Sequence, residues 1–182
     1  MSLPPELQSL ADDPKRSSSA WIIGCAATAF LLLGITGAII LPLFRQTSNS
    51  KQNELCVSNL RRLASVSFLY AEDNNGILPG KLGWMDQVVL YEDDPVRYSC
   101  PVQRRVDPTT FGYAFAKPLA GALLKKIPDA EKAAMIFDSK AVVRNAISDL
   151  ASVADPARHH NGRKNNVVFA DGHAQSIERI GP

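Results

Sequence analysis

The fold is decided by residues 45–76, "RQTSNSKQNELCVSNLRRLASVSFLYAEDNNG". Apolar residues recur here every three or four positions, at Leu60, Leu63, Ala64, Phe68 and Ala71. This spacing places them on one face of a helix, so the stretch predicts an amphipathic helix that buries that face. The helix is expected to end at "DNNG", where Gly76 suits the left-handed conformation that closes many helices.

The preceding stretch, residues 20–44, reads "AWIIGCAATAFLLLGITGAIILPLF" and contains no charged residue. A helix of this length reaches about 37 Å, which exceeds the roughly 30 Å hydrocarbon core of a bilayer. Trp21 and the flanking Lys15, Arg16 and Arg45 are typical anchors at the two membrane interfaces. We therefore predict a transmembrane helix. A cleaved signal peptide is the alternative, but it fits less well, because the apolar run is long and no A-x-A site closes it.

The chain accordingly divides into three parts. Residues 1–19 are predicted to be a short disordered tail, residues 20–44 a membrane span, and residues 45–182 a folded domain. No helix breaker lies between Arg45 and Asp73, so the span and the amphipathic stretch are expected to form one long helix.

Charge narrows the class of partner. The chain has 20 Lys and Arg residues against 18 Asp and Glu residues, mixed along its length, for a net charge of +2. No nucleic acid partner is expected, because no basic face is concentrated enough; the expected partner is the lipid bilayer. Basic residues flank the span on both sides in similar number, so the positive-inside rule does not fix its orientation.

The folded domain is predicted to be α+β, with the long helix packed on a small antiparallel sheet. Short aromatic or β-prone runs at 111–116 and 133–137 predict strands. Ser139 is expected to cap a helix over residues 140–151. A core that includes Leu60, Leu63, Val167 and Phe169 would join helix and sheet.

A β-hairpin is predicted over residues 166–177, "NVVFADGHAQSI". Asp171-Gly172 is a strong signal for a two-residue type I′ turn, which needs positive φ at both positions. Such a turn would pair Ala170 with His173 and Val167 with Ser176.

All three histidines lie near this hairpin, in "RHHNGRKNNVVFADGH", residues 158–173. His160, Asp171 and His173 are the candidate metal ligands, and the His159–His173 loop is the candidate ligand-binding loop. We favour structural histidines, because adjacent residues in an extended chain point to opposite faces and no H-E-x-x-H or paired C-x-x-C motif occurs.

Other sites are less well supported. Asp138 and Asp155 could supply oxygens to calcium, but their spacing matches no compact loop. No G-x-S-x-G, P-loop or G-x-G-x-x-G motif occurs, so neither an enzyme, a catalytic residue nor a cofactor is predicted.

Three cysteines occur, and Cys25 falls within the predicted span. Cys56 and Cys100 belong to the folded domain and would form a disulfide if that domain lies in an oxidising compartment. The chain-entropy model gives such a bond about 4 kcal/mol for a loop of about 45 residues. Two unpaired thiols are the alternative.

Two motifs carry a resemblance to a known family: "C-x-x-N-L-x-x-L…Y-x-x-D-x-x-G-x-x-P", beginning at Cys56, and "R-H-x-N-G…N-V-x-F-A-D-G-H", beginning at Arg158. With these motifs the chain, from about residue 35 to 178, resembles type IV pilin-like proteins of the type II secretion pseudopilin group. The resemblance implies a cytoplasmic N-terminus, a single span, a body outside the cytoplasmic membrane and filament assembly through apolar helices.

The chain departs from this family in two places. The prepilin peptidase site is missing, since no acidic residue occurs in residues 20–44. The histidine motif is one residue longer than the family pattern between His160 and Asp171, which fits a structural loop better than fixed ligand geometry. We therefore expect a membrane-anchored pseudopilin-like subunit or an unprocessed accessory protein that self-associates or joins other pilin-like subunits. The alternative is a membrane-anchored extracytoplasmic module that binds a metal or another ligand through the His159–His173 loop.

Overall fold

The computed structural model describes residues 18–149 and 164–177, except for the side chains of residues 18–28, 37, 39, 40 and 42–49. The first element, α1 (Ser18–Asp73), is a single α-helix. The chain divides into two compact units, Met1–Gln46 and Thr47–Pro182, which are described separately. Within the described residues, no helix combines the length and apolarity needed to cross a membrane.

In the first unit, the described part of α1 exposes large apolar side chains to solvent. The exposed fractions are 77% for Phe30, 65% for Leu31, 61% for Leu32, 68% for Leu33, 49% for Ile35 and 62% for Leu41. Four of these residues are consecutive, so their side chains point away from the helix axis in all directions.

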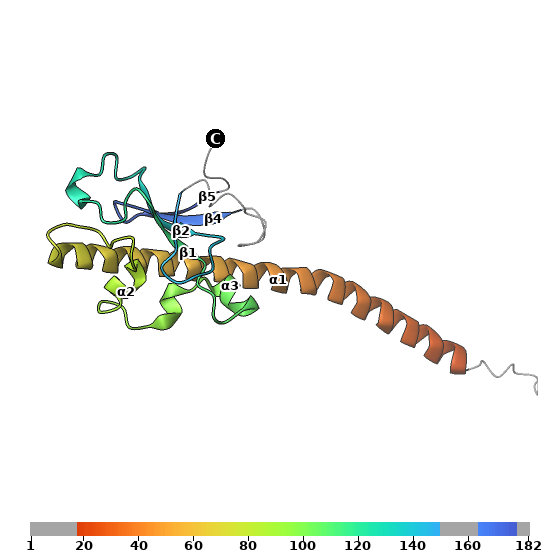
Figure 1. Cartoon of the computed structure of the whole chain (residues 1–182). Coiled ribbons are helices and arrows are strands. Elements are labelled where there is room, and N and C mark those ends of the chain that lie inside the picture. The colour runs from red at the N-terminus through yellow and green to blue at the C-terminus, as the bar shows by residue number, and fades with distance from the viewer. Residues whose placement is uncertain (1–17, 150–163, 178–182) are drawn as a thin grey trace, which may run out of the picture. The chain divides into compact units, whose positions relative to one another are not determined.

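The second unit is an α+β fold with a five-stranded sheet (Figure 1). Its short helices are α2 (Trp84–Val88), η2 (Pro95–Tyr98), α3 (Pro101–Val106) and η3 (Leu124–Lys126). Its strands are β1 (Tyr113–Ala116), β2 (Ala134–Asp138), β3 (Ile147–Ser148), β4 (Asn165–Phe169) and β5 (Ala174–Ile177). The strands at 111–116 and 133–137 were therefore predicted correctly to within two residues.

The sheet has the order β3-β1-β2-β4-β5. β1 with β2, β2 with β4, and β4 with β5 pair antiparallel, whereas β1 pairs with β3 in parallel. The sheet is therefore mixed rather than purely antiparallel, as a result of the two-residue strand β3.

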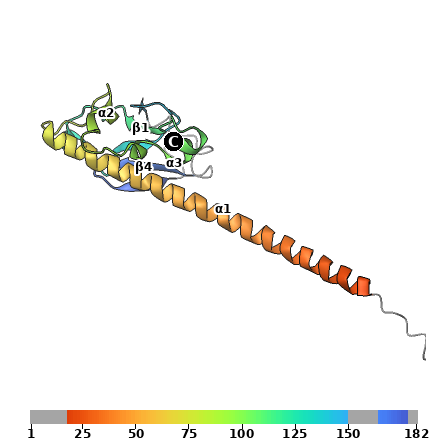
Figure 2. The ribbon, with the colours of Figure 1, turned by 90° about the horizontal axis from the view of Figure 1, so that it is seen from below.

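The core of this unit lies between the sheet and the second part of α1, which runs alongside the strands in both views (Figures 1 and 2). The predicted helix face is inside: Leu60, Leu63, Ala64 and Ala71 are buried, and Phe68 packs against them half-buried. Every residue of β1 and β2 is buried. Both strands thus have the central position that their apolar composition suits.

The end of α1 is as predicted. Asn75 and Gly76 have φ angles of 57° and 80°, and the Gly76 N–H donates to the carbonyl of Ala71 at 2.7 Å. This left-handed closure satisfies a carbonyl in the last turn of the helix.

The predicted helix over residues 140–151 is wrong as far as Asp149, the last described residue of that range. The Ser139 hydroxyl accepts from the N–H of Ala141 at 3.0 Å, which forms a tight turn instead of a helix cap. The carbonyls of Val142 and Ala146 accept from Phe111 and Phe115, respectively. Pairing with the β1 region thus takes the backbone groups that a helix would need.

The predicted hairpin is present as β4 and β5, but its turn and register are wrong. Val168 pairs with Ala174 and Val167 with Gln175, and the Phe169 N–H donates to the carbonyl of His173 at 2.9 Å. The loop therefore has three residues. Gly172 has a φ of 91° and Asp171 has no positive φ, as in a type I turn followed by a left-handed residue.

Candidate functional site

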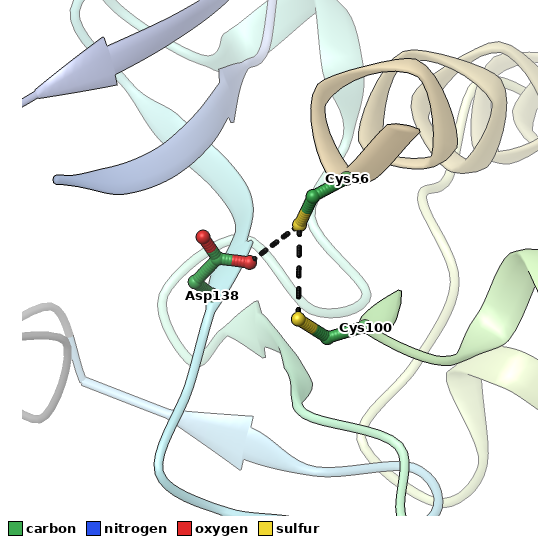
Figure 3. A group of neighbouring side chains, drawn as sticks. All are labelled: Cys56, Cys100 and Asp138. Atoms are coloured by element: carbon green, nitrogen blue, oxygen red, sulfur yellow. Dashed lines mark hydrogen bonds between the residues drawn. The ribbon is translucent and has the colours of Figure 1, made fainter. Parts of the chain in front are cut away.

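Three side chains with metal-binding or redox chemistry meet in the core of the second unit: Cys56, Cys100 and Asp138 (Figure 3). The two sulfur atoms are 4.0 Å apart, and Cys56 Sγ lies 2.9 Å from Asp138 Oδ1. The cysteines are fully buried and Asp138 is 1% exposed. Among the described residues, this is the one group of three or more His, Cys, Asp or Glu side chains close enough to share a metal ion.

Each side chain comes from a different element. Cys56 lies on the buried face of α1, one turn before Leu60. Cys100 directly precedes α3, where Pro101 occupies the first helical position, and its N–H donates to the carbonyl of Phe111 at 2.6 Å. Asp138 is the last residue of β2 and pairs with Tyr113 of β1. The group therefore forms only when helix and sheet are packed.

The carboxylate of Asp138 is held by Asn166 of β4. Asp138 Oδ2 accepts from the backbone N–H of Asn166 at 2.8 Å and from its side-chain Nδ2 at 3.0 Å. Asn166 also donates to Asn53 Oδ1 of α1 at 3.0 Å and accepts from the Ser176 hydroxyl of β5 at 2.5 Å. This network fixes the orientation of the carboxylate, and Oδ1 lies toward the sulfur of Cys56.

Two further polar groups border the sulfur of Cys56. The hydroxyl of Tyr113 is 3.2 Å from Cys56 Sγ, and Asn59 Nδ2 donates to that hydroxyl at 3.5 Å. Burial raises the pKa of Cys56 well above its usual value, and the neighbouring Cys100 and Asp138 raise it further. Burial also raises the pKa of Tyr113. Without a cation, the thiol of Cys56 and this phenol are therefore protonated near neutral pH.

The cysteines predicted to pair do lie side by side. The disulfide itself is not formed in the structure, because the two sulfur atoms are 4.0 Å apart, about twice the length of an S–S bond. Buried, protonated thiols are poor nucleophiles, so the chemistry open to this group is oxidation to a disulfide or binding of a thiophilic metal.

The described part of the predicted histidine loop contributes no residue to the group of Cys56, Cys100 and Asp138. His173 is exposed, its Nδ1 lies 2.6 Å from Asp171 Oδ1, and its ring stacks on Phe169 with 4.3 Å between centroids. Partial desolvation opposes a lower pKa of Asp171, but the hydrogen bonds from His173 outweigh it and lower the pKa. His159 and His160 lie outside the described residues. The structure thus brings together two of the three candidate ligands, Asp171 and His173, as neighbours within one turn.

Sequence reasoning missed Asp138 as a partner of the cysteines. It considered this residue only with Asp155, which lies outside the described residues. The available signal was the position of Asp138 directly after a predicted strand. What the sequence did not reveal is that β1, β2 and β4 would bring Tyr113, Asp138 and Asn166 to the same side of Cys56.

Comparisons with known proteins identify no relative: no family model, no curated protein and no solved structure matches this chain.

Proposed function

We propose that this chain is a membrane-anchored, pseudopilin-like structural and interaction protein with a pilin-like fold. Its role would be that of a subunit or accessory of a type II secretion or type IV pilus-like assembly, rather than that of an enzyme. The proposed topology has the N-terminus in the cytoplasm and the folded domain outside the cytoplasmic membrane. Its partners would be lipid and other helices of the same kind.

The observation that carries this proposal is the exposure of apolar side chains all around the first part of α1. Phe30, Leu31, Leu32 and Leu33 are each more than half exposed, and residues 20–44 contain no charge. A helix that is apolar on every side is stable when lipid or other helices surround it. The absence of the family's acidic residue in this stretch favours an unprocessed accessory over a processed filament subunit.

The test is a paired charge substitution in the full chain, expressed in a bacterium with two membranes. Leu32→Arg with Ile35→Arg adds a cost of about 5–7 kcal/mol to insertion and should move the protein out of the carbonate-resistant membrane fraction. The matched control is Leu55→Arg with Leu69→Arg, on exposed positions of the second part of α1, and should leave the protein membrane-bound.

Protease added to spheroplasts tests the orientation. It should digest the folded domain and leave a tag at the N-terminus intact. Release of the unaltered chain by carbonate, or protection of the folded domain, would refute the proposed anchor or its topology. Lysine cross-linking in the membrane then tests assembly: a ladder of homo-oligomers, or cross-links to other pilin-like subunits, supports it, and a monomer without cross-linked partners contradicts it.

A further inference from the structure

We infer that Cys56, Cys100 and Asp138 form a buried structural zinc site that ties α1, the start of α3 and the end of β2 together. All three residues belong to the second unit. With that unit outside the cytoplasmic membrane, as proposed above, zinc binding competes with oxidation of the same two thiols, and the experiment below separates the two outcomes.

The separation of the two sulfur atoms suits a tetrahedral zinc ion, whereas the 2.9 Å between Cys56 Sγ and Asp138 Oδ1 would have to open to about 3.5 Å. Zinc–sulfur bonds of about 2.3 Å place two thiolates about 3.8 Å apart, and the observed separation is 4.0 Å. The ligand atoms of the three residues all lie within 4.8 Å of one another. The Tyr113 hydroxyl, 3.2 Å from Cys56 Sγ, borders the group and is the nearest further oxygen for a fourth position.

The surroundings of Asp138 match those expected of a metal ligand. Ligating carboxylates are usually held by hydrogen bonds from a second layer of residues. Asn166 provides two such bonds to Oδ2, and Asn53 and Ser176 in turn fix Asn166. The other oxygen, Oδ1, lies 2.9 Å from Cys56 Sγ. A disulfide would use the two sulfurs alone, whereas a zinc ion would also bind the oxygen that faces Cys56.

Zinc binding leaves the net charge of this buried group unchanged, because the two positive charges of the ion replace the two protons of the thiols. Zinc binding would release one proton from each thiol and join the ion to two thiolates and the carboxylate. The released protons go to solvent, and no oxidant is needed. The ion would thereby replace the Cys56 S–H as the partner of Asp138 Oδ1 and lower the pKa values of both thiols.

The site would stabilise the fold because its ligands are far apart in sequence. Cys56 is 44 residues from Cys100 and 82 residues from Asp138. Such a site does not exist in the unfolded chain, so the free energy of metal binding adds to that of folding. Since the three side chains are at most 1% exposed, the ion is expected to enter during folding.

The experiment refolds the full chain in detergent, under reducing conditions, with one equivalent of Zn²⁺ or Co²⁺. We expect one metal per chain by mass spectrometry of the metal content. Cobalt should give a thiolate charge-transfer band in the near ultraviolet and the visible bands of a tetrahedral ion. Cys56→Ser and Cys100→Ser should lose the metal, whereas Cys25→Ser, the matched control, should retain it.

The variant Asn166→Ala tests whether Asp138 takes part in metal binding or whether the two thiols bind the metal alone. It leaves every proposed ligand in place, removes the side chain that orients the carboxylate, and should weaken zinc binding by about 10–100-fold. If the cysteine variants fail to fold, the cobalt spectrum of the unaltered chain still decides. A cobalt complex without the charge-transfer band would overturn the inference. So would metal-free protein from the native compartment whose mass is two hydrogens below the reduced value, because that result identifies a structural disulfide.

Discussion

The two parts of α1 both carry large apolar side chains, but among the described residues only the second part buries them within its own chain. Around Phe30 and Leu33 the helix exposes large apolar side chains, whereas around Leu60 and Leu63 comparable side chains are fully buried. Both stretches belong to one helix. The difference is that the second stretch is covered by strands of its own chain, and the described residues provide no such cover for the first.

This contrast is already present in the distribution of polar residues. Arg61, Arg62 and Glu72 occupy the outer side of the second part of α1, so its apolar residues form a stripe that one sheet can cover. Residues 20–44 have no charged side and form no stripe. The second part of α1 can therefore be covered by a sheet on one face. Residues 20–44 could be covered only by an apolar environment on all sides.

A pair of aspartate substitutions, one in each part of α1, should show the largest difference in stability between the two parts. Leu63→Asp places a charge without a partner in the core and should cost more than about 4 kcal/mol, enough to unfold the second unit. Leu33→Asp introduces the same change at an exposed position and should leave the unfolding of that unit unchanged.

Urea unfolding of the full chain in detergent, followed by Trp84 fluorescence in a Trp21→Phe background, measures both variants. Trp84 is suitable because it is fully buried in the second unit. Equal loss of stability in the two variants would show that the two parts of α1 do not differ in the way described.

The comparison also explains which parts of the fold could be predicted. The buried face of α1 was found because its signal, the spacing of Leu60, Leu63 and Ala64, is local to one helix. Residues 140–151 have an apolar spacing of the same kind, yet the described part of this range is a turn and a short strand. Asn145 has a φ of 60°, and its side chain accepts from the N–H of Met85 at 2.8 Å. Tertiary contacts there outweigh the local preference.

In the candidate sites, too, the residues with a local sequence signal were predicted and those that depend on tertiary contacts were not. The hairpin turn at Asp171 and Gly172 is a local signal and was found, although its loop is one residue longer than predicted. Cys56 and Cys100 were matched because cysteines are few. Asp138 was not matched with them, because its proximity depends on the pairing of β2 with β1 and β4, and no short stretch of sequence encodes that pairing.

Two adjacent arginines on the second part of α1, Arg61 and Arg62, should differ in their contribution to stability by an intermediate amount. Arg62 forms an ion pair with Glu92, whose side chain is only 8% exposed. Arg62→Ala would leave that carboxylate buried without its cation and should cost about 1–2 kcal/mol, a figure that allows for the 48% exposure of Arg62. Arg61→Ala, at an exposed position, is the control and should change the urea midpoint little. If both variants behave alike, the ion pair contributes nothing to the packing of α1.

The tip of the hairpin tests the packed part of α1 at a smaller magnitude. A Cβ at Gly172 would lie 3.2 Å from Phe68 Cε2, and the φ of this glycine is positive. Gly172→Ala should therefore cost about 1 kcal/mol. Gly80→Ala is the matched control, because its Cβ would meet only the end of the Gln87 side chain at 3.6 Å. A smaller loss for Gly172→Ala than for Gly80→Ala would contradict the contact between hairpin and helix.

The smallest effect is expected away from α1, at Asp86. Arg144 Nε donates to its carboxylate at 2.7 Å, and hydrogen bonds from Arg144 and then Asn145 lower the pKa of Asp86 below 3.8. A lowered pKa in the folded state means that this stabilisation is present above the unfolded pKa and is lost as the pH falls through the folded pKa. Because the side chain is 56% exposed, its contribution should stay below about 1 kcal/mol.

Urea midpoints of the unaltered chain and of Asp86→Asn, measured from pH 7 down to pH 3, isolate this contribution. The two midpoints should differ slightly above about pH 5 and converge as Asp86 becomes protonated. A difference that grows toward low pH would reverse the sign assigned to this ion pair. A difference as large as that of Arg62→Ala would mean that contacts far from α1 stabilise the second unit as much as contacts with the helix do, and the contrast between helix cover and surface contacts would then fail.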